Sequence, residues 1–281
     1  MHLSGQWGGR TVHKISACVI TFNDADNLQF SVASVGWADE IVVVDTGSTD
    51  RTIEIAESMG ARIVKTIPFA GFGEMRNRAK DACSHEWVFS LDADEHCTPE
   101  LRDEIIALMA SDPPHDAYLV PRRTYMMGRW LRGSSRPPDY RTPQLYRKDC
   151  LRYTPSLTHE AHELLSKRPL GHLQNLVWHY PISELEEALR KANLYSSLGA
   201  RALAGKRVSM WTALGHGAWA FLRLFILKRG FLDGWAGFVI ALSNFEGTFY
   251  RYAKAYEKEE AWGLPQTSVD EMRARPVRTG S

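Results

Sequence analysis

Residues 41–50, IVVVDTGSTD, decide the fold: four consecutive apolar residues end in a carboxylate and a polar turn that contains glycine. A run this apolar has no solvent-facing side, which is typical of a strand in a parallel sheet covered on both faces. Gly47 permits a tight turn, and residues 51–59 have the pattern of a helix. Strand, turn and helix together predict the repeating unit of an α/β fold.

The same alternation continues on both sides of this stretch. Apolar runs predict strands at residues 15–21, 62–65 and 87–91, and the segments between them predict helices, one ending near residue 35 and one over 72–83. Strands that alternate with helices imply a parallel sheet, because each helix carries the chain back across the sheet.

Polar side chains follow three of the predicted strands, at the point where each strand ends. Phe22-Asn23 follows the first strand, residues 45–50 begin at the end of the second, and residues 92–95 follow the fourth. In open α/β sheets the ligand lies beyond the carboxyl ends of the strands. We therefore expect the three polar segments to converge on one crevice.

The sharpest feature is the sequence LDADE at residues 91–95. Asp92 and Asp94, one residue apart at a strand end, can hold a hard divalent cation through oxygen ligands. Such a cation helps a nucleoside diphosphate to leave, because it stabilises the negative charge that develops on the β-phosphate. The alternative is a solvated acidic turn that caps the next helix. The two other polar strand ends nearby favour the catalytic interpretation.

Asp45, Ser48 and Arg76 are further candidates for binding a nucleotide. Asp45 can accept hydrogen bonds from a ribose or a base, and Ser48 precedes a helix whose N-terminus favours anions. A plain strand-turn-helix cap would give the same sequence. Arg76 and Arg78 diverge on their predicted helix, since residues two apart do not share a face.

Residues 99–182 are expected to form the acceptor side of the site. Thr98 as N-cap and Pro99 at the first helical position predict a helix over 99–110, and a strand is expected at 116–121. Residues 122–147, rich in arginine, proline and aromatic residues, predict strands and loops around an acceptor.

The segment HEAHE at residues 159–163 does not fit the zinc motif HExxH, because its histidines are three residues apart. A glutamate here is better interpreted as a base that removes the proton of an acceptor hydroxyl, with a surface carboxylate as the alternative. His172 and His179 are interpreted as structural.

The last third of the chain differs in pattern. Residues 183–204 predict a helix that starts with a Ser183/Glu186 capping box. Two apolar runs follow, at residues 211–227 and 231–245, and neither supplies the ~20 clean apolar residues of a membrane span. Their aromatic content and basic flanks predict amphipathic helices in a membrane interface. The alternative is a helical pair packed on the catalytic domain or forming a dimer contact.

Composition narrows the classes of function. Lys plus Arg number 34 and Asp plus Glu 33, and a formal net charge of +1 argues against nucleic acid as the main partner. The 4 cysteines form no CxxC pair, which argues against a disulfide scaffold and a structural zinc site. Residues 1–14 lack the apolar core of a secretory signal, so we expect a cytoplasmic protein.

Three segments, ISACVITFNDADN, IVVVDTGSTDRT and FGEMRNRAKDACSHEWVFSLDADE, resemble the catalytic half of glycosyltransferase family 2. Together with PDYRTPQLYRKD, AHE, the pair His179-Tyr180 and RGFLDGWAGF, they make residues 14–257 similar to the lipopolysaccharide core β-1,4-glucosyltransferase (WaaE-type) branch. The resemblance implies a Rossmann-like GT-A fold with a C-terminal helical extension, a UDP-sugar donor, Mg²⁺ or Mn²⁺, and inversion at the anomeric carbon.

The resemblance also assigns roles to residues. It implies a nucleotide-sugar pocket at Thr21, Asn23, Asp45, Ser48, Arg76 and Asp92. Asp92 and Asp94 would hold the metal, with Asp94 the direct ligand and a catalytic residue. The family's HE pair corresponds to His162-Glu163, which makes Glu163 the candidate base, with Glu160 and Asp139 as alternatives. Asp139, Arg141 and His162 are expected on the acceptor side.

These interpretations predict four regions. Residues 1–14 form a flexible N-terminus, and residues 15–182 form the GT-A domain, with a nucleotide-sugar half at 15–98 and an acceptor half at 99–182. Residues 183–260 form the helical region in contact with the membrane, and residues 261–281 form a flexible tail.

The expected reaction moves a hexose, glucose, from a UDP-sugar to a heptose of the lipopolysaccharide inner core, at the cytoplasmic face of the inner membrane. The alternatives are a polyprenol-phosphate or surface-polysaccharide glycosyltransferase and a nucleotide- or carbohydrate-binding scaffold without activity. A nucleotidyltransferase usually carries a Gly-rich basic loop after its first strand, and FNDADN is neither.

Overall fold

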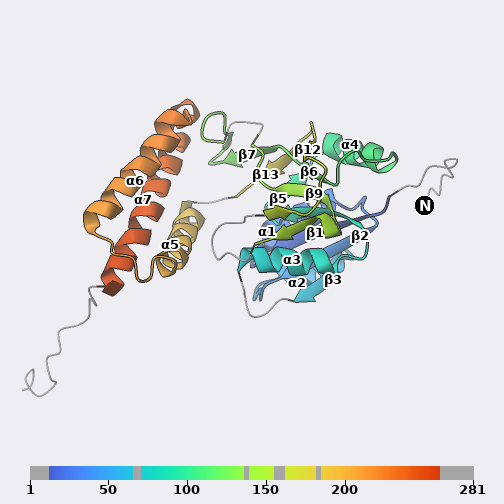
Figure 1. Ribbon diagram of the computed structural model, residues 1–281, viewed down its shortest axis with the longest axis horizontal. Helices are drawn as coiled ribbons and strands as arrows, with labels where there is room; N and C mark the ends of the chain where they lie inside the picture. Colours follow the sequence, from blue (N-terminus) through green and yellow to red (C-terminus); the bar gives the residue numbers. More distant parts are fainter. Residues whose placement is uncertain (1–12, 66–70, 136–138, 155–161, 182–184, 260–281) are drawn as a thin grey trace, which may run out of the picture.

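The computed structural model describes residues 13–65, 71–135, 139–154, 162–181 and 185–259. An α/β part precedes a helical part, in which α5 (Leu185–Arg201) lies between the sheets and the pair α6 (Met210–Leu222) and α7 (Gly234–Glu259) (Figure 1). The predicted flexible ends lie outside the described residues, apart from His13 and Lys14.

The main sheet has the strand order β12-β6-β9-β4-β1-β2-β3. β1 pairs in parallel with β2 and β4, and β2 with β3, whereas β9 runs antiparallel to β4 and β6. The strands predicted in the first hundred residues are confirmed. The bounds are β1 (Ile15–Thr21), β2 (Glu40–Asp45), β3 (Arg62–Lys65), β4 (Trp87–Asp92), β6 (Ala117–Leu119), β9 (Pro143–Arg147) and β12 (Gly171–His172).

Helices cover both faces of this sheet, as its apolar strands require. The bounds are α1 (Ala25–Ser34), α2 (Thr52–Ser58), α3 (Phe72–Ala82) and α4 (Pro99–Met109). Leu28, Ala56 and Leu101 of α1, α2 and α4 belong to one buried cluster with Val19. Ala79 of α3 belongs to the cluster on the opposite face. The helices therefore fix β4, β1 and β2 as neighbours whose carboxyl ends share one edge.

A smaller sheet begins where LDADE ends. Its order is β5-β13-β7-β8, with bounds β5 (Glu95–Cys97), β7 (Arg122–Met126), β8 (Arg129–Trp130) and β13 (Val177–His179). Asp92 closes β4 and Glu95 opens β5, so the acidic motif joins the two sheets. A separate hairpin consists of β10 (Leu151–Tyr153) and β11 (His162–Leu164).

The C-terminal helices expose much of their apolar surface. The first helix of the pair continues through a π-helical turn, Arg223–Leu227, and a short 3-10 turn, Gly230–Asp233, leads into α7. Trp211 is 81% exposed and Leu227 64%. Ser183 of the predicted capping box lies outside the described residues.

One helical stretch, Met210–Leu227, is long and apolar enough to cross a membrane by length and composition: it has 18 residues, a mean hydropathy of 1.2 and 17% of its residues buried. The sequence predicted no membrane span here, because the run at residues 211–227 falls short of ~20 clean apolar residues and contains the charged Arg223. The helix passes through Arg223 without a break.

Candidate active site

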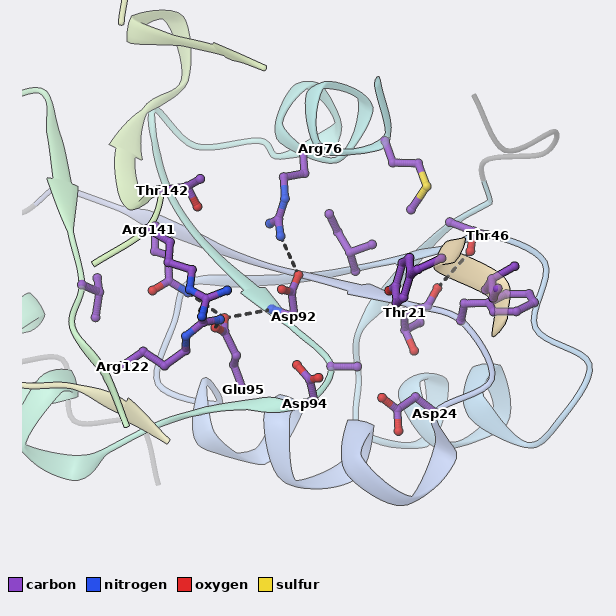
Figure 2. A pocket seen from close by; sticks show the side chains of 18 of the residues that line it. Thr21, Asp24, Thr46, Arg76, Asp92, Asp94, Glu95, Arg122, Arg141 and Thr142 are labelled. Atoms are coloured by element: carbon purple, nitrogen blue, oxygen red, sulfur yellow. Dashed lines mark hydrogen bonds and ion pairs between the residues drawn. The ribbon is translucent and has the colours of Figure 1, made fainter. Parts of the chain in front are cut away.

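The polar ends of β1, β2 and β4 open into one cavity of about 810 Å³. Segments of the acceptor half close its far side, so the cavity lies between the two halves of the α/β part (Figure 2). The convergence predicted from the sequence is confirmed for Phe22, Thr46, Asp92 and Asp94, so all three strand ends reach the cavity. Thr21 and Arg76 line the same cavity. The polar residues that line the cavity are Thr21, Asp24, Thr46, Arg76, Asp92, Asp94, Glu95, Arg122, Asp139, Arg141, Thr142, Gln144 and Tyr195.

Asn23 and Ser48 join the loops after β1 and β2. The backbone N–H of Asn23 donates to Ser48 Oγ at 2.8 Å, and Asn23 Oδ1 accepts from the N–H of Thr49 at 2.7 Å. Asn23 has a φ of 48°, in the left-handed region that asparagine tolerates better than most residues. Neither side chain lines the cavity. The structure thus gives both residues a role in holding the loops, and their contact with a nucleotide stays a prediction.

Asp45 is buried beneath its own turn. Its carboxylate accepts the N–H of Gly47 at 2.9 Å and of Ser48 at 3.1 Å, and Gly47 has a φ of 109°, which favours glycine. Asp45 is 1% exposed and does not line the cavity. Thr21 does line it, and its buried hydroxyl has no hydrogen-bond partner within the described part of the chain. A polar ligand atom can satisfy this hydroxyl.

Arg76 reaches from α3 to the DxD motif. Its guanidinium donates to Asp92 Oδ1 at 2.8 Å and to Ser90 Oγ at 3.3 Å (Figure 2). The Asp92 side chain remains 40% exposed, towards the cavity. Arg78 pairs instead with Glu74 on the exposed side of the helix, which confirms that the two arginines diverge.

The pKa of Asp94 is strongly perturbed. Burial, followed by the charges of Asp92 and Glu95, raises the pKa of Asp94 to about 8. Its Oδ1 atom is buried without a hydrogen-bond partner among the described residues, and His179 Nε2 lies 3.8 Å from its Oδ2. The main-chain N–H of Tyr180 donates to the Asp94 carbonyl at 2.8 Å, which fixes the turn.

These carboxylates fit a divalent cation. An unsatisfied carboxylate oxygen beside a second, exposed carboxylate offers the oxygen ligands that Mg²⁺ and Mn²⁺ prefer. The described residues contain no cluster of three or more His, Cys, Asp or Glu suited to a metal. A cation held by Asp92 and Asp94 would therefore take its remaining ligands from water and phosphate oxygens.

Glu95 is bound by protein groups and is not a candidate metal ligand. It is 3% exposed, and it accepts Arg122 Nη1 at 3.2 Å, Gln144 Nε2 at 2.7 Å and the N–H of Asp92 at 3.3 Å. Although its burial raises the pKa of Glu95, the charge of Arg122 opposes this shift. Glu95 thereby anchors the acceptor half to the DxD turn.

Sequence reasoning missed Arg122 and Gln144 and did not connect His179 with the acidic motif. His179 Nδ1 contacts Thr124 Oγ1 at 3.1 Å, and burial holds its pKa well below the ordinary value, so the histidine is neutral beside Asp94. Gln144 and His179 do fall in the segments PDYRTPQLYRKD and HY. Their order in the chain carries no sign of which carboxylate each meets.

Asp139 and Arg141, which the sequence predicts on the acceptor side, line the cavity, and their contact with an acceptor stays a prediction. Arg141 donates to Asp139 Oδ2 at 3.0 Å, and Arg122 Nη2 lies 3.5 Å from the same atom. Burial raises the pKa of Asp139, but the hydrogen bond and charge of Arg141 outweigh it and lower the pKa overall.

The structure does not bring His162 and Glu163 to the cavity. They lie on β11, where Glu163 pairs opposite Arg152 and is exposed, and neither is among the lining residues. Glu160 lies outside the described residues. Of the three predicted bases, Asp139 is the one that the described structure places in the cavity.

Comparisons with known proteins identify the family. The family model "Glycosyl transferase family 2" matches residues 16–172. A relative from Rickettsia bellii, an uncharacterized glycosyltransferase, is 32% identical over 258 residues, covering 87% of this chain and 86% of its own. The lipopolysaccharide core biosynthesis glycosyltransferase LpsC of Rhizobium meliloti is 28% identical over 261 residues, covering 89% of this chain and 95% of its own.

Among solved structures, that of S. aureus TarS 1-349 in complex with UDP is 17% identical with a TM-score of 0.45, covering 92% of this chain and 95% of the other. The family model spans more than half of the chain, including β1, β2, β4 and the DxD turn, and the fold is of the GT-A type. The chain belongs to glycosyltransferase family 2.

Proposed function

We propose that this glycosyltransferase moves a hexose, glucose, from a UDP-sugar to a heptose of the lipopolysaccharide inner core, with inversion at the anomeric carbon. The observation that supports a UDP-sugar donor is the pair Asp92 and Asp94 near the end of β4. Both residues line a cavity that is also lined by Arg76. The similarity to LpsC over nearly the whole chain supports the acceptor class.

On the donor side, each residue has a distinct task. Asp94 and Asp92 would hold Mg²⁺ or Mn²⁺, which when bound neutralises charge on the departing diphosphate. Arg76 fixes the rotamer of Asp92 through a 2.8 Å hydrogen bond and adds positive charge to the same end of the cavity. The buried Thr21 hydroxyl can donate to a donor oxygen.

On the acceptor side, the reaction is a single displacement. The acceptor hydroxyl oxygen bonds to the anomeric carbon, the bond from that carbon to the β-phosphate oxygen breaks, and the hydroxyl proton moves to a carboxylate. Glu163, Glu160 and Asp139 are the candidate bases. Asp139 lines the cavity, but its neighbours Arg141 and Arg122 weaken it as a base. For this reason Glu163 and Glu160 remain candidate bases beside Asp139.

The exposed apolar surface of α6 and α7 supports a place at the cytoplasmic face of the inner membrane. Trp219 is 56% exposed and Trp235 58%, far more than a packed soluble helix pair requires. A lipid-linked acceptor presented at the membrane surface would then meet the cavity from that side. The same surface favours the second candidate, a polyprenol-phosphate acceptor.

Product analysis tests this proposal. The enzyme is incubated with a panel of UDP-sugars and three acceptors: inner-core lipopolysaccharide that ends in heptose, the same lipid without heptose, and polyprenol phosphate. We expect transfer of glucose to the heptose-ended acceptor alone, with the β-anomer seen by NMR. Transfer to polyprenol phosphate would replace the heptose assignment, and an α-linked product would contradict inversion.

The base is tested in the same assay. The variants Glu163→Gln, Glu160→Gln and Asp139→Asn are compared, with Asp112→Asn, an exposed carboxylate beyond the end of α4, as the control. Removal of a general base costs about 10²–10⁴-fold in kcat. The base is the residue whose loss lowers kcat by that factor and leaves donor binding unchanged.

A further inference from the structure

A second cavity, of about 400 Å³, lies between the β7–β8 hairpin and the short turn Gly230–Asp233 that joins α6 to α7. Three arginines line it, Arg123, Arg129 and Arg132, together with Trp130 and Leu232. We call it the arginine pocket. Its lining residues come from the smaller sheet and from the turn between α6 and α7. Figure 1 shows β7 of that sheet on the side that faces the helix pair.

The arginine pocket is on the opposite side of β7 from the reaction cavity. Successive side chains of a strand point to opposite faces. Arg122 lines the reaction cavity and Thr124 contacts His179, whereas Arg123 and Tyr125 line the arginine pocket. A ligand in this pocket is therefore separate from the donor diphosphate.

The pocket holds a surplus of positive charge. None of its three arginines forms an ion pair with a carboxylate of the described chain. Its one carboxylate, Asp233, is 2% exposed, and its oxygens accept the N–H groups of Arg132 at 2.6 Å, Gly133 at 3.0 Å and Ser134 at 2.8 Å. Asp233 thus builds the loop that carries Arg132 and leaves the arginine side chains to a ligand.

Two of the guanidinium groups are held in place by aromatic rings. Arg123 lies over Trp130 at 4.9 Å, and Arg129 lies over Trp235 at 5.8 Å and donates to the carbonyl of Asp233 at 3.1 Å. A guanidinium has five N–H donors, so each keeps donors for an oxyanion. Positioned guanidinium groups around a cavity are suited to a phosphate group.

Exposed apolar side chains adjoin the pocket: Leu232 lines it, Phe231 precedes Leu232 in the chain, and Trp235 lies against Arg129. Phe231, Leu232 and Trp235 are between 49% and 58% exposed, and Lys228 and Arg229 adjoin them in the chain. Aromatic side chains beside arginine and lysine are typical of the boundary between a bilayer and water. The surroundings of the arginine pocket therefore match a phosphate that is attached to a lipid.

We propose that the arginine pocket binds the phosphodiester headgroup of an anionic phospholipid and seats the helix pair on the membrane surface. This inference rests on the proposed membrane association and adds its ligand. The headgroup would hold the β7–β8 hairpin, and with it the acceptor side of the reaction cavity, at the lipid surface. Each basic residue near an anionic surface contributes about tenfold or less to binding.

The test is co-sedimentation of the full chain with vesicles of phosphatidylcholine alone or mixed with phosphatidylglycerol. The double variant Arg123→Gln/Arg132→Gln is compared with a control of equal charge change, Arg51→Gln/Arg102→Gln, whose arginines are exposed on the α/β part. Arg129 is left intact because it also supports Asp233. We expect the pocket variant to lose about 10-fold or more of its affinity for the mixed vesicles, and the control to lose little.

Three further arms make the result specific. Thermal unfolding shows whether the variants fold. If the double variant does not fold, Arg132→Gln alone is used, because the Arg132 side chain forms no ion pair or ring contact in the described part of the chain, and its main-chain N–H still donates to Asp233. Arg123→Lys/Arg132→Lys keeps the charge and is expected to keep most of the binding. Inorganic phosphate is expected to compete no better than sodium chloride of equal ionic strength.

The inference is overturned by equal binding to both vesicle types, by an equal loss in the control, or by specific competition from inorganic phosphate. The last result would make free phosphate the ligand. The assay contains neither donor nor acceptor, so a failure of the proposed sugar transfer leaves its outcome unaffected.

Discussion

The neighbouring carboxylates Asp94 and Glu95 differ in their partners: Glu95 is 3% exposed, and the side chain of Asp94 is 18% exposed. Glu95 accepts hydrogen bonds from Arg122, Gln144 and the Asp92 main chain, so its charge is satisfied by the protein. Asp94 has a buried oxygen without a partner among the described residues. A buried carboxylate oxygen in that condition is costly unless a ligand completes it, which is why Asp94 rather than Glu95 is the metal candidate.

Substitution of Arg76 tests its contact with Asp92. Arg76→Gln removes a charge-assisted hydrogen bond to Asp92, which contributes about 1.5–3 kcal/mol, so kcat/KM for the UDP-sugar is expected to fall by about 10- to 100-fold. Arg78→Gln, on the same helix, is the control. Its pair with Glu74 is exposed, and such pairs contribute about 1 kcal/mol or less. Steady-state kinetics that show equal losses in both variants would contradict the role of Arg76.

Glu40 gives a prediction about pH. Partial burial raises the pKa of Glu40, but hydrogen bonds from Ser16, Arg62 and Ser84 outweigh this and lower it from 4.5 to about 2. A pKa that is lower in the folded state contributes stability above the unfolded value, and this contribution is lost as the pH falls from 4.5 towards 2.

Glu40→Gln should therefore lower the free energy of unfolding at pH 7 by about 1–3 kcal/mol. The difference from the wild type should narrow as the pH falls from about 5 to 3. Denaturant unfolding at a series of pH values measures it. A difference that stays constant across this range would show that the ionised carboxylate is not the source of the stability.

At the scale of elements, the joint between the β7–β8 hairpin and the α6–α7 turn is held by close backbone contact. A Cβ added to Gly133 would lie 1.9 Å from the carbonyl oxygen of Arg229, and Asp233 accepts three N–H groups of the loop at residues 132–134. Residues about 100 positions apart in the chain thereby form one rigid joint.

Gly133→Ala tests this joint. The added methyl group must displace backbone, so we expect a loss of about 1–3 kcal/mol in the free energy of unfolding. The control, Gly215→Ala, adds a methyl group to the exposed side of α6 with nothing within 4 Å, and it should raise stability by up to about 1 kcal/mol. If Gly133→Ala is as stable as the wild type, the two elements are not joined as described.

Across the whole molecule, the features predicted correctly from the sequence are those that depend on local sequence pattern. Buried strands such as β2 and β4 consist of apolar runs, and Thr98 caps α4 through a hydrogen bond from the N–H of Leu101, as its position before Pro99 predicted. The crevice at the strand ends followed from the geometry of parallel sheets alone.

The features that could not be predicted from the sequence depend on contacts between residues far apart in the chain. Arg122 reaches Glu95 from a strand 27 residues away, and Gln144 from one 49 residues away. Glu163 pairs opposite Arg152 in the β10–β11 hairpin and does not line the cavity, and a motif match does not contain that pairing. The exposure of the helix pair depends likewise on which faces remain uncovered after folding.

The most direct test of the central claim is UDP release from UDP-glucose in the presence of Mn²⁺ or Mg²⁺, with the wild type beside Asp94→Asn and Asp112→Asn, with and without EDTA. The account predicts turnover by the wild type and by Asp112→Asn that EDTA abolishes and added metal restores, and a loss of about 10²-fold or more in Asp94→Asn. UDP release by Asp94→Asn at the wild-type rate, or full activity in EDTA, would contradict a metal-assisted site at the end of β4.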